Sequence, residues 1–118
     1  MGTILSAETR AQLFANQRGS ATLTTSPILL AVDEDWSYGF GNWLECPGAI
    51  GANTYNCGAG HRNSSPGAYG AYPFIDFDHD YFGMLSRQGP LGTFPEGLAI
   101  MREIEEEATE WAVCASSQ

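Results

Sequence analysis

Hydrophobic positions in the second half of the chain form two short runs that are separated by an acidic break. Residues 71–77 make up the first run and residues 81–85 the second, and the break between them is Asp78-His79-Asp80. Two runs of aromatic and β-branched residues around a short Asp-rich break predict a β-hairpin, with strands at 66–77 and 81–88. Because the first run is apolar at nearly every position, we expect both faces of its strand to be covered.

The C-terminal segment carries a helical pattern instead of an alternating one. Thr93 and Glu96 have the spacing of a capping box, and Pro95 lies in the first turn, where a missing N–H does no harm. Apolar residues then recur at helical spacing, at Leu98, Met101, Ile104, Ala108 and Trp111. The pattern predicts a helix over residues 94–114 whose apolar stripe, including Trp111, covers the sheet.

The first half of the chain is less regular. Ser6 has the position of an N-cap for a helix over residues 6–16 that Gly19 ends, and a strand is expected over residues 37–45. The chain is therefore predicted to be α+β, with an antiparallel β-sheet covered by a C-terminal helix. As a single domain or fragment it would consist of an N-terminal helix and turn, an irregular segment, the sheet, and the helix with its tail, at residues 1–19, 20–36, 37–92 and 93–118.

The balance of charge narrows the classes of partner. The chain of 118 residues, enough for one domain, carries 14 acidic residues against five arginines and no lysine, and its formal net charge is −9. A chain with this charge repels nucleic acid and anionic lipid, and no apolar run reaches the length of a membrane span. We therefore expect neither nucleic acid nor a membrane as a partner.

Cysteine spacing suggests a disulfide. Cys46 and Cys57 bracket a loop rich in glycine, asparagine and proline, residues 47–56, which a disulfide would close. The alternative is two buried free thiols. A disulfide would imply an exported protein, either secreted or periplasmic, because such bonds persist in oxidising compartments. Cys114, in the tail, has no evident partner in the sequence.

The polar segment before the buried strand is the candidate site. Residues 63–67, Asn-Ser-Ser-Pro-Gly, bring hydroxyls, an amide and flexible backbone to the mouth of that strand, where functional sites often lie. Two acidic clusters, at residues 33–35 and 76–80, raise the question of a metal. Adjacent carboxylates of this kind are more often turn or surface residues, and no Cys-x-x-Cys pair is present, so we expect neither a metal nor another cofactor.

The order of these features resembles a known family. An LSAET-type helix, a YGFGNW strand, a polar Gly/Ser-rich strand entrance, the stretch GAYGAYPFIDFDHDYFGMLSRQ and a closing helix follow one another along most of the chain. This order is similar to the C-terminal part of serine β-lactamase-like hydrolases, which include class C β-lactamases, DD-peptidases and related esterases. In that family a strand with a Lys-Thr-Gly or His-x-Gly motif is followed by a Gly-aromatic-Gly step, a hairpin and a terminal helix.

The resemblance implies roles in oxyanion and substrate binding for five residues. When the chain is aligned on its Tyr-Gly step, the family motif falls near Arg62, Asn63 and Ser64. Ser65 then takes the position that supplies a backbone N–H to the oxyanion hole. A slip of one residue places His61 at the basic position of the motif instead.

The family's nucleophile lies in Ser-x-x-Lys, and a chain without lysine cannot contain that pair. The resemblance therefore implies a C-terminal portion that is inactive alone and meets a small-molecule ester, amide or lactam substrate only with the rest of the enzyme. Two other functions stay open: a non-catalytic binding or assembly module that reuses the fold, and a self-contained hydrolase that uses His61 with Ser64 or Ser65. As part of a larger enzyme, the chain is expected to bury an apolar face by self-association or against a second chain.

Overall fold

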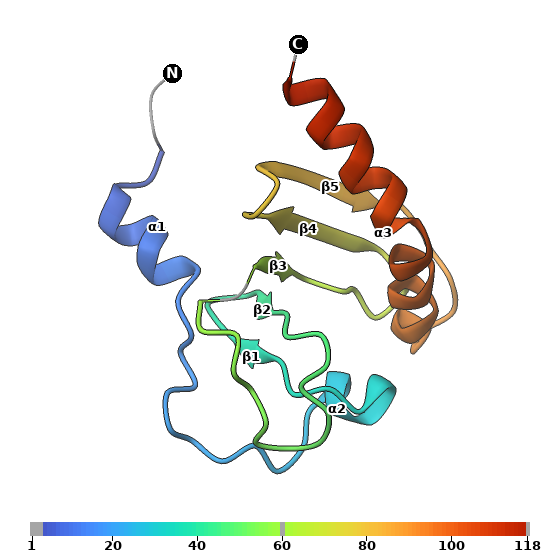
Figure 1. Ribbon diagram of the computed structural model, residues 1–118. Helices are drawn as coiled ribbons and strands as arrows, with labels where there is room; N and C mark the ends of the chain where they lie inside the picture. Colours follow the sequence, from blue (N-terminus) through green and yellow to red (C-terminus); the bar gives the residue numbers. More distant parts are fainter. Residues whose placement is uncertain (1–3, 60, 118) are drawn as a thin grey trace. The chain divides into compact units, whose positions relative to one another are not determined.

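The computed structural model describes residues 4–59 and 61–117, and it confirms the α+β prediction (Figure 1). Five strands form an antiparallel sheet in chain order, β1-β2-β3-β4-β5, and a long helix closes the chain. The elements are α1 (Ala7–Leu13), α2 (Pro27–Val32), β1 (Ser37–Tyr38), β2 (Trp43–Leu44), β3 (Arg62–Ser64), β4 (Tyr72–Asp76), β5 (Tyr81–Leu85) and α3 (Phe94–Ser116). By internal contacts the chain divides into two compact units, Met1–Asn63 and Ser64–Gln118.

The second unit is built on the predicted hairpin and the closing helix. β4 pairs with β5 in an antiparallel register that sets Tyr72 opposite Leu85 and Asp76 opposite Tyr81. α3 packs across β4 and β5 (Figure 1), and the Tyr81 hydroxyl lies 3.1 Å from that of Thr109 on the helix. Tyr72, Phe74, Leu98, Met101 and Ala112 form the buried core of this unit.

The face that α3 buries differs from the predicted stripe. Leu98 and Met101 are buried as expected, but Ile104 is 43% exposed and Trp111 is 73% exposed, whereas Ala112 is buried. At about 100° per residue, Ile104 and Trp111 are rotated by about 60° and 80° from Met101, and Ala112 by only about 20°. The predicted burial of Trp111 is therefore wrong, because the stripe continues through Ala112 instead.

The start of α3 is also held differently from the predicted capping box. The Thr93 side chain makes no capping hydrogen bond. Its hydroxyl donates to the carbonyl of Pro90 at 2.8 Å and accepts from Arg87 Nη1 at 3.0 Å. Glu96 pairs with Arg87 instead of reaching back to the cap. The first turn then approaches the backbone of the β3–β4 connection so closely that a Cβ on Gly97 would lie 2.2 Å from the carbonyl oxygen of Gly70.

In the first unit, the single strand expected over residues 37–45 is a tight hairpin of two short strands. The chain turns between β1 and β2, where the N–H of Gly39 donates to the carbonyl of Asn42 at 2.8 Å and Gly41 has φ +79°. That positive φ favours glycine. The Asn42 side chain steadies the turn by donating to the carbonyl of Phe40 at 3.3 Å.

The two short helices of this unit are both capped by serine. Ser6 caps α1 as predicted, but the helix ends at Leu13, well before Gly19. Ser26 caps α2 by accepting from the N–H of Leu29 at 3.0 Å. This helix lies in the segment that was expected to be irregular. A serine cap followed by proline in the first turn was the signal for it.

The predicted disulfide is present. Cys46 and Cys57 are bonded, with their Cα atoms 5.5 Å apart, and Cys114 is a free, exposed thiol. The bond is compatible with an extracellular or periplasmic location. Within the described ranges, no helix combines the length and the apolar character that a bilayer crossing requires.

Candidate functional site

The five residues of the predicted site lie along β3 and at its ends. Arg62, Asn63 and Ser64 form the strand and are buried, with 6%, 3% and 2% of their surface exposed. His61 and Ser65, on either side, are exposed. The structure therefore brings the middle three residues onto one buried strand and leaves the outer two at its margins.

The backbone of this segment gives the predicted oxyanion donor a different role. The N–H of Ser65 donates to the carbonyl of Pro73 at 3.0 Å, and it is therefore engaged in the sheet. On an antiparallel strand, successive residues direct their backbone groups to alternate edges. The N–H of Ser64 is accordingly directed to the edge away from β4.

Asn63 and Ser64 on β3 each carry a buried oxygen that has no hydrogen-bond partner in the part of the chain that the structure describes. Asn63 donates through Nδ2 to Oδ1 of Asn42 at 2.6 Å, but its own Oδ1 accepts no hydrogen bond. The Ser64 hydroxyl is likewise buried without a partner. An unsatisfied buried polar group costs about 1–3 kcal/mol, so such atoms in a native protein are commonly completed by water or a ligand.

A buried carboxylate organises the first unit. Asp35 is fully buried and receives both terminal nitrogens of Arg18 together with the N–H groups of Thr54 and Tyr55, at 2.7 and 2.9 Å. Burial alone would raise the pKa of the Asp35 carboxyl, but the Arg18 and backbone donors outweigh burial and hold this pKa below its ordinary value. Arg18 also lies over the ring of Tyr55, 5.6 Å from its centroid.

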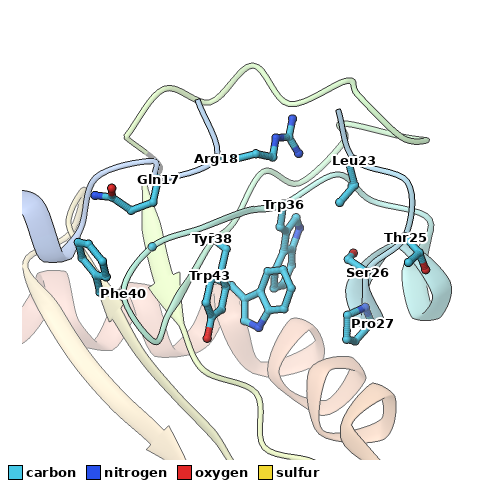
Figure 2. A pocket seen from close by; sticks show the side chains of 11 residues that line it. Gln17, Arg18, Leu23, Thr25, Ser26, Pro27, Trp36, Tyr38, Phe40 and Trp43 are labelled. Carbon is cyan, nitrogen blue, oxygen red and sulfur yellow. The ribbon is translucent and has the colours of Figure 1, made fainter. Parts of the chain in front are cut away.

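A hollow of about 410 Å³ lies beside this ion pair, and we call it the aromatic groove (Figure 2). Its lining combines aromatic rings with small polar and aliphatic side chains: Gln17, Arg18, Leu23, Thr25, Ser26, Pro27, Trp36, Tyr38, Gly39, Phe40 and Trp43. In Figure 2 Leu23, Ser26 and Pro27 lie on one side of the two tryptophans, and Phe40 and Gln17 lie on the other. Ligand pockets commonly have a volume of this order.

The rings of the groove are positioned by the β1–β2 hairpin. Tyr38 and Trp43 are direct cross-strand partners, and their ring centroids are 4.7 Å apart in an edge-to-face arrangement. Trp36 is 1% exposed, and its indole N–H donates to Glu34 at 2.8 Å. By contrast, 46% of Tyr38 and 61% of Phe40 is open to solvent. The groove thus has a fixed aromatic base and exposed aromatic edges.

Sequence reasoning missed the aromatic groove. The signal was a set of four aromatic residues, at positions 36, 38, 40 and 43, in a Gly-rich stretch for which the sequence predicted only a strand. The second wall comes from residues 17–27, and no local pattern links that segment to the hairpin.

The acidic cluster at the β4–β5 tip is turn structure. Oδ1 of Asp76 accepts the backbone N–H groups of Asp78 and His79, each at 3.0 Å, and Asp80 adopts φ +52°. The Nδ1 atom of His79 lies 3.1 Å from both carboxylate oxygens of Asp76. Over residues 4–59 and 61–117 no group of three or more His, Cys, Asp or Glu side chains is arranged to hold a metal ion.

Comparisons with models of protein families, with curated proteins and with solved structures found no match for the chain. Function therefore has to be inferred from the geometry of the chain itself. That geometry offers three features: a buried strand with unsatisfied polar atoms, an aromatic groove, and a face of the β4–β5 hairpin on which Phe82 and Met84 are exposed.

Proposed function

We propose that the chain is the C-terminal sheet-and-helix portion of a serine β-lactamase-like hydrolase, of the esterase, peptidase or lactamase class. In this role it supplies the oxyanion-hole strand and part of the substrate cleft, and it is inactive alone because it has no Ser-x-x-Lys nucleophile. The observation that carries the proposal is the apolar face of β4 and β5 that nothing in its own unit covers.

Residues alternate between two faces along these strands. Tyr72 and Phe74 face α3 and are buried, whereas Ile75, Phe82 and Met84 lie on the other face and are 36%, 83% and 63% exposed. Burying one such side chain contributes about 1.5–3 kcal/mol. A strand pair that is apolar on both faces but covered on one is typical of a part that packs against further structure, such as the remaining sheet and helical domain of the proposed enzyme.

β5 is also the last strand in the order of the sheet, and among the described residues its outer edge pairs with no other strand. An open edge of uncharged residues, Tyr-Phe-Gly-Met-Leu, is a ready template for another strand. The uncovered face and the open edge meet on the same strand, which favours one partner that covers both.

The two alignments of the family motif place the oxyanion donor at different residues. The first alignment needs the N–H of Ser65, and that group donates to the carbonyl of Pro73. The alignment shifted by one residue places His61 at the basic position and moves the donor to Ser64, whose N–H is directed to the edge where β2 lies in the order of the sheet. The direction of the backbone groups therefore does not choose between Ser65 and Ser64. A tetrahedral intermediate needs two such donors, and in the proposed enzyme the second lies at the nucleophile.

The first test is turnover of nitrocefin-type lactams and p-nitrophenyl esters by the purified chain, compared with Ser64→Ala and Ser65→Ala. We expect all three proteins to remain at the background rate. The proposal would be contradicted if the wild-type chain, as a stable monomer, hydrolysed a substrate well above background and Ser64→Ala or Ser65→Ala abolished that rate.

The second test addresses the uncovered face by light scattering. The wild-type chain should self-associate, and Phe82→Arg should shift it toward monomer because a charge in the buried patch is costly. Leu91→Arg is the matched control, since Leu91 is 72% exposed but lies outside the two strands. Equal masses for all three proteins would show that this face is not an interface.

One specific observation also favours a second candidate, a non-catalytic binding module. The aromatic groove lies wholly within the first unit and needs no missing residue to complete it. A binding role for this unit is compatible with the first proposal, and each can fail without the other.

A further inference from the structure

We propose that the aromatic groove binds a proline-rich peptide segment in the polyproline II conformation. This inference does not depend on the proposed hydrolase role, because every residue that lines the groove belongs to the first unit. It rests on three properties of the groove: its exposed rings, its lack of free charge and its free hydrogen-bond donors.

Exposed rings give the groove its apolar contact surface. Tyr38 and Trp43 are held edge to face at 4.7 Å, and Phe40 extends the aromatic edge with 61% of its surface exposed. Pro27 and Leu23 form the opposite side (Figure 2). Aromatic-lined grooves of this kind are the surfaces that receive the rings of proline-rich segments.

The groove carries no free charge. Arg18 is the one charged residue in its lining, and both of its terminal nitrogens bind the buried carboxylate of Asp35. An anionic ligand would have to compete with this pair, and the overall charge of −9 opposes it further. A cationic ligand would meet the guanidinium in the same wall. The groove therefore suits an uncharged ligand.

The polar groups at the groove include donors for a ligand that accepts hydrogen bonds. No other described residue hydrogen-bonds the indole N–H of Trp43 or the hydroxyl of Tyr38, so both can donate to a ligand.

A proline-rich segment matches this supply. Proline has a carbonyl but no N–H, and polyproline II makes no internal hydrogen bonds, so its carbonyls stay available as acceptors. Because the peptide is already ordered before it binds, it also loses little conformational entropy.

The test is a titration of the full chain with a polyproline peptide, monitored by tryptophan fluorescence in a Trp111→Phe background. Trp111 is exposed and lies in the second unit, so its removal should leave binding unchanged and limit the signal to the first unit. We expect saturable binding, whereas a glycine-serine peptide of equal length should not bind.

Two conservative variants test the assigned contacts. Trp43→Phe keeps a ring but removes the indole donor, and it should weaken binding by between about twofold and tenfold, the effect of one net hydrogen bond. Tyr38→Phe, measured in the same background, removes the hydroxyl and should have an effect of the same size. Circular dichroism reports whether each variant folds, and either variant alone is sufficient for the comparison.

Three results would overturn the proposal. The first is the absence of saturable polyproline binding to the folded wild-type chain. The second is unchanged affinity in both variants. The third is tighter binding of a neutral oligosaccharide or of a quaternary ammonium compound than of polyproline, which would assign the groove to a different class of ligand.

Discussion

Gly97→Ala gives the sharpest test of how α3 packs in the second unit. An alanine in a helix interior is normally more favourable than glycine by about 1 kcal/mol. Here, however, the added Cβ would lie 2.2 Å from the carbonyl oxygen of Gly70, 2.9 Å from its carbonyl carbon and 3.0 Å from its Cα. These atoms are backbone and cannot rotate away, as a flexible side chain could.

The size of the effect follows from that distance. Ordinary contact begins at 3.4 Å, so the helix and the Gly70 backbone must separate by more than an ångström to relieve the clash. Leu98 and Met101 are buried in the same helix and would lose packing in the process. Overpacking typically costs about 1–3 kcal/mol and occasionally more. We therefore expect a net destabilisation of about 2 kcal/mol, opposite in sign to helix propensity.

Urea denaturation followed by circular dichroism measures this difference. The matched control is Gly67→Ala, in the same unit, where the added Cβ would meet only ordinary contacts at 3.6 and 3.8 Å. That variant should change the free energy of unfolding by less than about 0.5 kcal/mol. If Gly97→Ala unfolds at the same or a higher urea concentration than the wild type, the close approach of helix and backbone is wrong.

Three further predictions concern the core, the ion pair and the disulfide. Leu98→Ala should lower the free energy of unfolding by about 2–5 kcal/mol, whereas Trp111→Ala should lower it by less than about 0.5 kcal/mol. A larger effect of Trp111→Ala than of Leu98→Ala would show that Trp111 is buried after all. The pKa of Asp35 is lowered on folding, so its stabilisation is complete above its ordinary pKa of 3.8 and is lost as the pH falls through the lower folded value. Asp35→Asn should lower the free energy of unfolding at neutral pH, and the variant should lose less stability than the wild type as the pH becomes acidic. An unchanged dependence of stability on pH would refute the role of the carboxylate. Thiol titration of the native oxidised protein should find Cys114 alone, and reductant should remove stabilisation on the order of 3 kcal/mol in the wild type but not in Cys46→Ser.

The elements that the sequence predicted correctly are those with a local signal. The Asp-rich break identified the β4–β5 hairpin, and the bounds of α3 followed from its helical period. The face that α3 buries had no such signal. Apolar residues occupy both position 111 and position 112, and the choice between them depends on which side of the helix can approach the backbone of Gly70.

The candidate site was predicted less completely than these elements. The sequence predicted a polar entrance at residues 63–67 to a strand over residues 66–77, whereas the structure has a separate buried strand at residues 62–64 and places β4 at Tyr72–Asp76. The edge to which each N–H is directed could not be predicted, because it depends on the register with β4, in which the N–H of Ser65, just after β3, donates to the carbonyl of Pro73. The aromatic groove could not be predicted from the sequence either, because its two walls come from separate stretches that only the folded chain brings together.

The closed loop between Cys46 and Cys57 has a consequence for where the protein can be made. Thr54 and Tyr55, which donate to the buried carboxylate of Asp35, both lie inside this loop. In a reducing cytoplasm the loop is open, and these two donors must be gathered from a more flexible chain at a higher entropic cost. Expression in an oxidising compartment should therefore yield more soluble protein with an intact first unit, and a cytoplasmic preparation should recover it only after air or glutathione oxidation.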